Sequence, residues 1–344
     1  MYILSMSDKN TLSIKDIARL SGVSVATVSH VLNKKGRYSK ETEEKVNRII
    51  RQYGYRMNNA AKSLKSSSSH TVGLIIPSIN NDFFSTIAST VETWFDEHDY
   101  SLFICNTNND PDKEIRYFRR LDAMQVDGIL CISCQRMLDS TLLTRDIPVL
   151  LIDRKPINNQ DLCTVESDAE DGIYTTTKTL IERGCRNILF VSSYLAAYVS
   201  TSRKNGYLRA MQEYQLPAGE ETVLQLPKGM SLQTAEVAIV DYVQSGKPVD
   251  AVVCTSDNQA IGVMTGLKRL GISIPDDVKV TGFDNQFQSQ ICTPTLSTIA
   301  RDPYSLAVIA SGNMYKLIQG DTDIERHVVL KTRLIEREST QTAK

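Results

Sequence analysis

Polar and aromatic side chains follow several apolar runs of this 344-residue chain, directly after the point where each run ends. Carboxylate, amide and guanidinium groups can hold neighbouring hydroxyls, and aromatic faces stack on the CH surface of a sugar ring. This mixture of residue types therefore favours the binding of a small carbohydrate. The candidates are Asn81, Phe83 and Phe84 after residues 72–76, Asp153 and Arg154 after 149–152, Ser256 and Asp257 after 251–254, and Phe283 and Asp284 after 278–280.

Each of these side chains has an alternative role as a helix cap or in a surface ion pair. The alternative applies most directly to Asp257, which could cap a helix beginning at Asn258. A cluster of such groups at several strand ends is nevertheless what a ligand site in an open α/β sheet requires.

An enzyme is the main competing class of protein, but the sequence lacks the usual catalytic patterns. Its four histidines, His30, His70, His98 and His327, are not paired at metal-ligand spacing. The nucleotide-binding patterns G-x-x-x-x-G-K-[ST] and G-x-G-x-x-G are missing, as is the nucleophile elbow G-x-S-x-G. We therefore expect a binding protein with no catalytic residue, no metal and no cofactor.

Short apolar runs alternate with amphipathic stretches between residues 70 and 344, and these elements must position the candidate side chains. The apolar runs predict buried parallel strands, and the stretches between them predict helices. Alternating strands and helices imply an α/β body, and its length is sufficient for two lobes with one sheet each. The predicted strands are residues 72–76, 102–105, 128–132, 149–152, 188–191, 251–254 and 278–280.

Cysteine usage and hydropathy indicate a cytoplasmic protein. The seven cysteines are odd in number and mostly lie in apolar runs, which is typical of reduced core thiols. Cys131 and Cys134 form a C-x-x-C pair, which we interpret as part of a buried strand. Residues 1–10 do not resemble a signal peptide, and no run of about 18 apolar residues occurs, so we expect no membrane contact.

The first 55 residues predict a helix-turn-helix head. Two short helices are joined by a turn containing Gly22, and a third helix ends at Gly54. Residues 1–66 carry a net charge of +8 and the remainder a net charge of −9, which suits a nucleic-acid-binding head on an acidic body. Predicted caps are Ser13 with Asp16, Ser24 and Ser39; predicted apolar faces are Ile14, Ile17 and Ala18, then Val28, Val31 and Leu32, then Val46, Ile49, Ile50 and Tyr53.

These residues carry a family resemblance that continues through almost the whole chain. The segments that carry it are Ile14-Lys15-Asp16-Ile17-Ala18, Gly22-Val23-Ser24, Ala26-Thr27-Val28-Ser29, Val31-Leu32-Asn33 and Thr42-Glu43-Glu44-Lys45-Val46. They resemble the head of the LacI/GalR family of bacterial transcriptional regulators. The resemblance implies a homodimeric repressor of a near-palindromic DNA operator, with a two-lobed body like the type I periplasmic binding proteins and a small-molecule effector.

The resemblance also implies which residues contact the double-stranded DNA. His30 stands where the family usually has Arg, so it would either donate to a guanine edge or, as the alternative, contact a phosphate or make no DNA contact. Residues 55–65 resemble the family's hinge helix, in which Leu64 would wedge into the minor groove; an ordinary linker is the alternative. The implied DNA-binding residues are Ser13, Ser24, Val25, Ala26, Thr27, Ser29, His30, Asn33, Tyr55, Asn58, Ala61, Lys62 and Leu64.

The family resemblance also implies where the domain boundaries lie. We expect a helix-turn-helix domain at residues 1–56, a hinge and linker at 57–69, and an effector-binding and dimerisation body at 70–344. Lobe one would comprise about 70–160 plus 288–318, and lobe two about 161–287 plus 319–340. Crossovers between the lobes would lie near 153–162, near 284–294 and after 318.

The resemblance adds Arg203 and Arg301 to the predicted effector site. Arg203 opens Arg203-Lys204-Asn205-Gly206-Tyr207, which is similar to the family's Arg-x-x-Gly-Tyr signature. Ser256 stands where relatives commonly have a ligand-binding Asn, and Arg301 stands where several have Gln. The complete set resembles a ribose-type site, which favours a pentose or another monosaccharide. Because Arg301 is a cation, a sugar phosphate stays open as the effector, and a sugar-binding protein without regulatory function is a further alternative.

Overall fold

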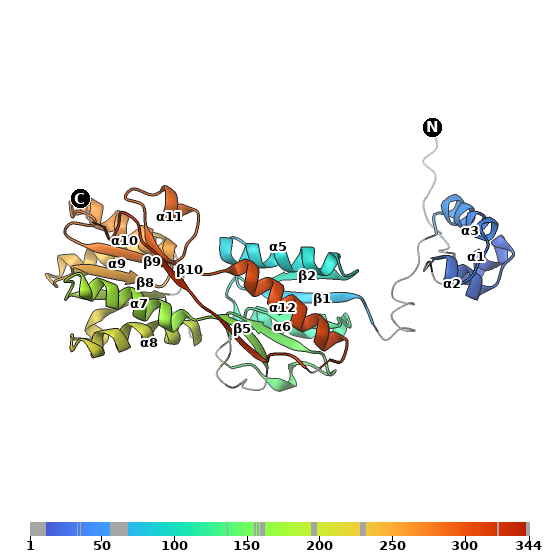
Figure 1. Cartoon of the computed structure of the whole chain (residues 1–344), viewed down its shortest axis with the longest axis horizontal. Coiled ribbons are helices and arrows are strands. Elements are labelled where there is room, and N and C mark those ends of the chain that lie inside the picture. The colour runs from blue at the N-terminus through green and yellow to red at the C-terminus, as the bar shows by residue number, and fades with distance from the viewer. Residues whose placement is uncertain are drawn as a thin grey trace. The chain divides into compact units, whose positions relative to one another are not determined.

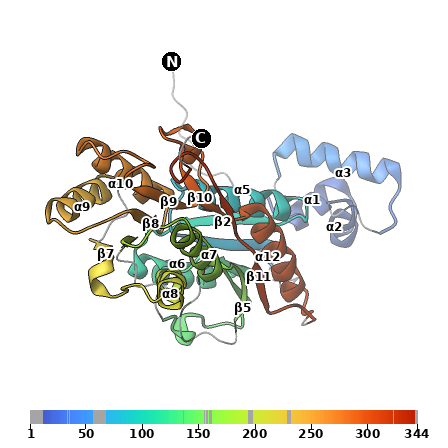
Figure 2. The ribbon, with the colours of Figure 1, turned by 60° about the vertical axis from the view of Figure 1, so that its left-hand side comes forward.

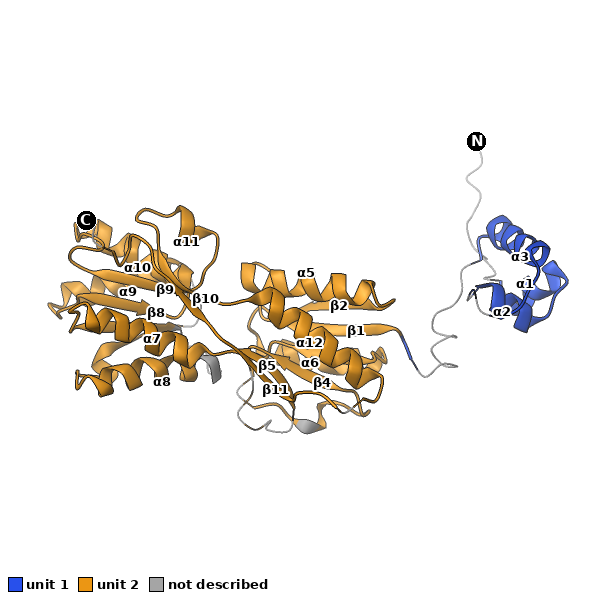
Figure 3. Ribbon diagram, viewed as in Figure 1, with its two compact units in different colours: residues 1–69 blue, residues 70–344 orange. Residues whose placement is uncertain are grey.

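The computed structural model describes residues 12–55, except 33 and 35, and residues 68–341, except 136, 155, 157, 159–161, 194–197, 228–231 and 322. The chain divides into two compact units, residues 1–69 and residues 70–344 (Figure 3). Within the described residues, none of the helices has both the length and the apolar character needed to cross a bilayer.

The head unit packs helices α1 (Ile14–Ser21), α2 (Val25–Leu32) and α3 (Lys40–Tyr53) around a small apolar core. Ser13 and Asp16 form the predicted capping box, because each side chain accepts a hydrogen bond from the other residue's backbone amide. Glycines with positive φ end α1 and α3, at Gly22 (66°) and Gly54 (62°). The fully buried core residues are Ile17, Ala18, Val28, Val31 and Val46.

The end of α3 differs from the prediction. Tyr53, which we expected on the apolar face, is 48% exposed. Tyr55 packs against the core instead. The left-handed conformation of Gly54 reverses the chain, so that the Tyr55 amide donates to the carbonyl of Ile50 (3.1 Å) and the Tyr55 ring returns towards the core.

Lobe one of the body is a six-stranded parallel sheet, in the order β11-β5-β4-β3-β1-β2 among the described residues. Helices α5 and α12 lie side by side on one face, and α6 covers the other (Figures 1 and 2). The elements are β1 (Thr71–Ile76), α5 (Asp82–Asp96), β2 (Ser101–Asn106), α6 (Pro111–Ala123), β3 (Gly128–Cys131), η1 (Ser140–Leu142), β4 (Val149–Ile152), β5 (Cys163–Ser167), α12 (Pro303–Ile318) and β11 (His327–Leu330).

Lobe two is a second six-stranded sheet, in the order β12-β10-β9-β8-β6-β7 among the described residues. All neighbouring strands are parallel except β12, which runs antiparallel to β10. Helices α7 and α8 pack on one face, and α9 and α10 pack on the other. The elements are α7 (Ala169–Glu182), β6 (Ile188–Ser193), α8 (Tyr198–Glu213), η2 (Glu220–Thr222), β7 (Val223–Leu226), α9 (Leu232–Gln244), β8 (Ala251–Cys254), α10 (Asp257–Arg269), β9 (Lys279–Asp284), α11 (Gln288–Ile291), β10 (Ser297–Ala300) and β12 (Arg333–Ile335).

Two largely parallel α/β sheets in the body and a separate helical head confirm the predicted fold class, but the crossovers between the lobes differ from the prediction. The chain crosses from β5 to α7, from β10 to α12 and from β11 to β12 (Figure 1). Because β5 pairs with β4, lobe one extends to residue 167, and it also contains α12 and β11. The expected limits at 160, 288 and 318 therefore do not match the sheets. Strands β5 and β10 are short and rich in Thr, Ser or Glu, so their apolar pattern is weak, and β11 is only four residues long.

The seven cysteines are free, and six of them are buried. Cys131 lies in β3, and Cys134 follows it, with its thiol 2.9 Å and its amide 2.7 Å from the carboxylate of Glu114. Burial and then the charge of Glu114 raise the pKa of the Cys134 thiol. Both thiols are buried, which agrees with our interpretation of the pair as part of a buried strand and its end.

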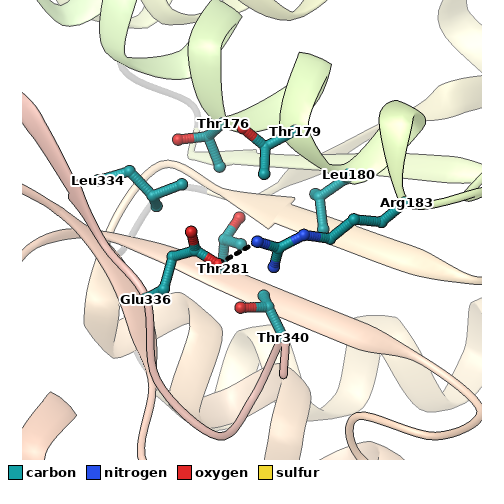
Figure 4. A pocket seen from close by; sticks show the side chains of 8 residues that line it. All are labelled: Thr176, Thr179, Leu180, Arg183, Thr281, Leu334, Glu336 and Thr340. Atoms are coloured by element: carbon teal, nitrogen blue, oxygen red, sulfur yellow. Dashed lines mark ion pairs between the residues drawn. The ribbon is translucent and has the colours of Figure 1, made fainter. Parts of the chain in front are cut away.

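A small pocket lies in lobe two between α7, β9 and β12 (Figure 4). Arg183 and Glu336 form an ion pair across it, and threonines provide much of the remaining lining. The pocket contains none of the predicted effector residues, and it lies beside Thr281 rather than at the carboxyl end of β9. We therefore place the candidate functional site elsewhere, where the strand ends of the two lobes meet.

Candidate functional site

Predicted effector residues from both lobes meet in one buried cluster at the carboxyl ends of the strands. Lobe one supplies residues at the start of α5 and after β4, and lobe two supplies residues from α8 and the end of β9. Arg301 follows β10, on a crossover between the lobes. The members of this interlobe cluster are Phe83, Phe84, Asp153, Arg154, Arg203, Phe283, Asp284 and Arg301, and each side chain is at least nine-tenths buried.

Arg301 joins the two lobes through a pair of buried carboxylates. Its Nη1 donates to Asp153 Oδ1 of lobe one, and its Nη2 donates to Asp284 Oδ1 of lobe two (2.5 Å). We expected all three side chains to be available to an effector. The structure instead pairs them with one another. Arg301 therefore links the two lobes through ion pairs and is not a free cation.

Burial and charge act in opposite directions on this triad. Burial, the largest single effect, would raise the pKa of Asp153, but the charges of Arg301, Arg203 and Arg154 and the hydrogen bond from Arg301 together outweigh it, so the pKa of this carboxyl is lowered. Burial would likewise lower the pKa of Arg301, but Asp153 and Asp284 together raise it. Asp153 and Arg301 are therefore both held in their charged forms.

Each arginine of the cluster lies over a phenylalanine ring. The guanidinium carbon is 3.3 Å from the Phe83 centroid for Arg301, and 3.7 Å from the Phe283 centroid for Arg203. Arg154 lies 5.1 Å from the centroid of Phe84. These distances are typical of cation–π contacts. The aromatic faces that we expected to stack on a sugar are thus covered by guanidinium groups, which an entering ligand must displace or share.

Asp257 is a buried residue for which the sequence left two roles open, in the cleft or as a helix cap. It does not cap α10, because Ser256 is the N-cap and accepts from the Gln259 amide (3.3 Å). Asp257 instead accepts from the Gln286 amide (2.6 Å) and the Thr298 hydroxyl (2.5 Å).

These hydrogen bonds hold the turn that presents Asp284. Asp284 and Asn285 both have positive φ, 112° and 53°, which is costly for residues other than glycine. The amide of Asn285 donates to Thr298, which in turn donates to Asp257, and Arg337 donates to the Asn285 side chain (2.6 Å). Asp257 therefore acts as a positioning residue for Asp284.

Replacing Asp257 with asparagine should change how stability depends on pH. Burial and then the charge of Asp284 raise the pKa of Asp257 to about 7, well above its value in an unfolded chain. Between about pH 4 and pH 7 the folded state thus holds a proton that the unfolded state has lost, so wild-type stability falls as pH rises. The free energy of unfolding of wild type relative to Asp257→Asn should fall by up to about 4 kcal/mol across this window. Urea titrations at several pH values measure this difference, and a constant difference would show that Asp257 is already ionised.

The predicted Arg-x-x-Gly-Tyr segment aims Arg203 at the cluster. Tyr207 donates to the Ile188 carbonyl (2.8 Å) and stacks on Phe190, which anchors α8 to β6. Gly206 lies where α8 crosses α7 so closely that a Cβ would be 2.2 Å from the Glu170 carbonyl oxygen. The spacing therefore serves helix packing and also places Arg203 in the interlobe cluster.

Replacing Gly206 with alanine should destabilise lobe two by about 1 to 3 kcal/mol, because α8 must move away from α7. The movement should also displace Arg203 and weaken effector binding. Gly312→Ala is a matched control, since a Cβ at that helical glycine of α12 meets no atom within 4 Å. Thermal unfolding of both variants tests the expectation, and an unchanged midpoint for Gly206→Ala would contradict it.

Two further predicted effector residues serve as helix caps. Asn81 accepts from the amides of Phe83 (3.0 Å) and Phe84 (3.4 Å) at the start of α5, and Ser256 caps α10. Asn81 thereby fixes the backbone that carries both rings. Asn109, which the sequence did not single out, is the acceptor of Arg154 Nη1 (3.4 Å).

The predicted DNA-binding residues fall partly within the described head. Val25, Ala26 and His30 are exposed on α2, and the hydroxyl of Ser24 accepts from the Thr27 amide (3.0 Å). The imidazole of His30 lies against Gly36, since a Cβ there would be 2.8 Å from its Nδ1. Ser13 caps α1, Ser29 is half-buried and Tyr55 is packed on the head core. Asn33, Asn58, Ala61, Lys62 and Leu64 lie outside the described residues.

Known protein families match both the head unit and the body unit of this chain. A model of bacterial regulatory proteins of the lacI family matches residues 13–58, and a periplasmic binding protein-like domain matches residues 177–340. The HTH-type transcriptional repressor PurR of Vibrio atlanticus (strain LGP32) is 33% identical over 335 residues, covering 96% of this chain and 99% of the relative. The HTH-type transcriptional regulator RegA of Clostridium saccharobutylicum is 32% identical over 331 residues, covering 95% and 99%.

Solved structures share the fold. A lac repressor dimer bound to operator and the anti-inducer ONPF has a TM-score of 0.84 at 21% identity, covering 97% of this chain and 100% of that chain. A complex of the transcriptional regulator CelR with cellobiose has a TM-score of 0.68 at 23% identity, covering 95% and 99%. At these identities the likeness concerns the fold alone.

Proposed function

Because the chain belongs to the lacI family of bacterial regulatory proteins and is a DNA-binding transcriptional repressor, we propose that a small carbohydrate bound between its lobes controls it. The observation that carries this proposal is the interlobe cluster, in which charged and aromatic side chains of both lobes meet. A ligand that touches both lobes binds their closed and open arrangements with different affinity. It can therefore shift the equilibrium that governs DNA binding.

A monosaccharide, and in particular a pentose, is the effector class that we favour. Carboxylate and guanidinium groups at several strand ends suit neighbouring hydroxyls, and the three phenylalanine rings suit a sugar's CH surface once the guanidinium groups shift. A purine base is the competing class, because a flat ring would stack on the same phenylalanine faces.

Operator release by a ligand panel tests the proposal. Fluorescence anisotropy of operator DNA bound to the full chain should change with a monosaccharide or its derivative. Arg203→Gln should reduce that change, while Arg209→Gln, on the exposed surface of α8, should leave it unaltered. A response to purine bases and to no sugar would replace the carbohydrate with the competing class.

For DNA, we propose that α2 enters the major groove and that the segment around Leu64 enters the minor groove. The first part rests on exposed Val25, Ala26 and His30, and the second on the sequence resemblance. Two heads are needed for a near-palindromic operator, so we propose a homodimer. Exposed apolar side chains support this state, since Phe103 and Ile104 on β2 and Phe287 and Ile291 near and on α11 would be covered by a second copy.

Replacing Leu64 with alanine should reduce operator affinity by about tenfold to a hundredfold, because an apolar wedge is needed to open a base step and bend the DNA. Leu64→Met keeps an apolar side chain and should retain most of the affinity. Anisotropy titrations with operator DNA measure both variants, and effector binding by calorimetry should be unchanged in each. Equal operator affinity for wild type and Leu64→Ala would exclude the wedge.

A further inference from the structure

The interlobe cluster contains more positive than negative charge. Its arginines are Arg154, Arg203 and Arg301, whereas its carboxylates are Asp153 and Asp284. The three arginines are 7%, 8% and 8% exposed. Buried charges in proteins are normally paired, because an unpaired ion loses its hydration without compensation. One positive charge in this cluster therefore has no matching carboxylate among the described residues.

The unmatched charge belongs to Arg154 and Arg203. Both carboxylates accept from Arg301, as described above. Arg203 Nη1 donates to the neutral carbonyl of Thr255 (2.5 Å), and Arg154 Nη1 donates to the neutral amide of Asn109 (3.4 Å). In the part of the chain that the structure describes, neither guanidinium has a carboxylate oxygen within 4.0 Å. Both also have a buried Nε with no hydrogen-bond partner.

Two other buried carboxyls, those of Glu114 and Asp257, are already hydrogen-bonded elsewhere. The oxygens of Glu114 accept from Ser133 (2.6 Å) and from the amide and thiol of Cys134. Asp257 accepts from the turn that presents Asp284 and forms no ion pair with the cluster. Thus neither carboxyl forms an ion pair with Arg154 or Arg203 among the described residues.

We infer that the effector carries a carboxylate or phosphate group, which binds between Arg154 of lobe one and Arg203 of lobe two. The inference rests on the proposed function and specifies the charge of the carbohydrate, which would be a sugar acid or a sugar phosphate. Arginine suits both anions, because its N–H groups match two oxygens at once. An anion bound by both arginines would join the two lobes. Arg301 already joins them in the converse way, since one cation there binds a carboxylate from each lobe.

The electrostatics of Arg203 support this assignment. Burial and then the neighbouring Arg301 lower the pKa of Arg203 to about 9, even with Asp284 and Asp153 acting in the other direction. An anion beside Arg203 would reverse this effect. The orphan Nε atoms supply the hydrogen-bond donors for it.

The first test places a carboxylate next to Arg154 by substitution. Asn109→Asp would give Arg154 a negatively charged partner. The thermal midpoint of the full chain without ligand should therefore rise. Asn108→Asp is the matched control, since Asn108 is the neighbouring exposed residue, has nearly the same φ and bonds Asn106. The control should not raise the midpoint.

Ligand binding is then compared by calorimetry and thermal shift with ribose, ribonate, ribose 5-phosphate and inorganic phosphate. At least one anionic sugar should bind wild type about tenfold or more tightly than ribose does, and inorganic phosphate should stabilise wild type weakly. Asn109→Asp, Arg154→Gln and Arg203→Gln should each abolish the preference for anions, while Asn108→Asp keeps it. Ribonate and ribose 5-phosphate distinguish a carboxylate site from a phosphate site.

The outcomes separate this inference from the proposed function. If ribose binds as tightly as both anionic sugars and Asn109→Asp does not alter the ratio, the effector charge is wrong but the carbohydrate class stands. If inorganic phosphate stabilises wild type and no sugar binds, the anion site stands and the carbohydrate class fails. If neither an anionic sugar nor inorganic phosphate binds, the inference is overturned.

Discussion

Replacing Arg301 with glutamine should lower the free energy of unfolding of the body by about 3 to 5 kcal/mol. The variant leaves Asp153 and Asp284 buried without their shared partner, and an unpaired buried carboxylate retains its full desolvation cost. Urea unfolding of the full chain, followed by far-UV circular dichroism, measures the change.

A matched control separates burial from charge. Arg209 of α8 also bridges two carboxylates, Glu170 (3.2 Å) and Asp171 (3.3 Å), but its side chain is 47% exposed. Because solvent screens such a pair, Arg209→Gln should cost no more than about 1 kcal/mol. The triple variant Arg301→Gln, Asp153→Asn, Asp284→Asn removes all three charges and should recover most of the stability lost in Arg301→Gln.

Lobe opening is the alternative response to the loss of this link. If Arg301→Gln retains wild-type stability and small-angle scattering shows a more extended body, the carboxylates have become hydrated and the triad holds the cleft closed. If the variant retains both wild-type stability and wild-type dimensions, the triad has no role in joining the lobes.

Local signals explain how much of the fold the sequence could predict. The strands β1, β3, β4, β6 and β8 are near-continuous apolar runs, because helices cover both faces of a parallel sheet. The capping box of Ser13 and the positive φ of Gly22 depend on residues within one turn, so the pattern predicted them directly. Strand β10, in contrast, reads Ser-Thr-Ile-Ala and buries its hydroxyls, and its burial depends on partners distant in the chain.

The same distinction applies to the candidate site. Residue types at the strand ends correctly indicated a cluster, since the carboxyl ends of parallel strands meet at one edge of a sheet. The partners within the cluster could not be predicted, because Arg301 is 148 positions from Asp153 and no local pattern joins them. The role of Asp257 could not be decided from the sequence for a related reason. A helix cap and a buried hydrogen-bond acceptor look alike in sequence, and three-dimensional contacts with Gln286 and Thr298 decide between them.

Operator binding should weaken on the order of a thousandfold or more when salt rises from about 50 to about 200 mM. The charge that drives binding is concentrated in the first 66 residues, with 13 Lys and Arg against 5 Asp and Glu, while the body is acidic. Two such heads on one operator would each neutralise several phosphates and release the counterions condensed there. Anisotropy titrations of operator DNA at several salt concentrations measure the slope of log affinity against log salt.

Charge neutralisation in the head and in the body should affect this slope differently. Replacing Lys15, an exposed residue of α1, with glutamine should reduce the slope by about one per lost phosphate contact, hence by about two for a dimer that uses both copies. Arg209→Gln on the body should leave the slope unchanged, because that side chain already pairs with Glu170 and Asp171. A slope near zero for wild type would show that base contacts, and not phosphate contacts, supply the affinity. A slope that matches the phosphate contacts of a single head would show that a monomer is the DNA-binding species.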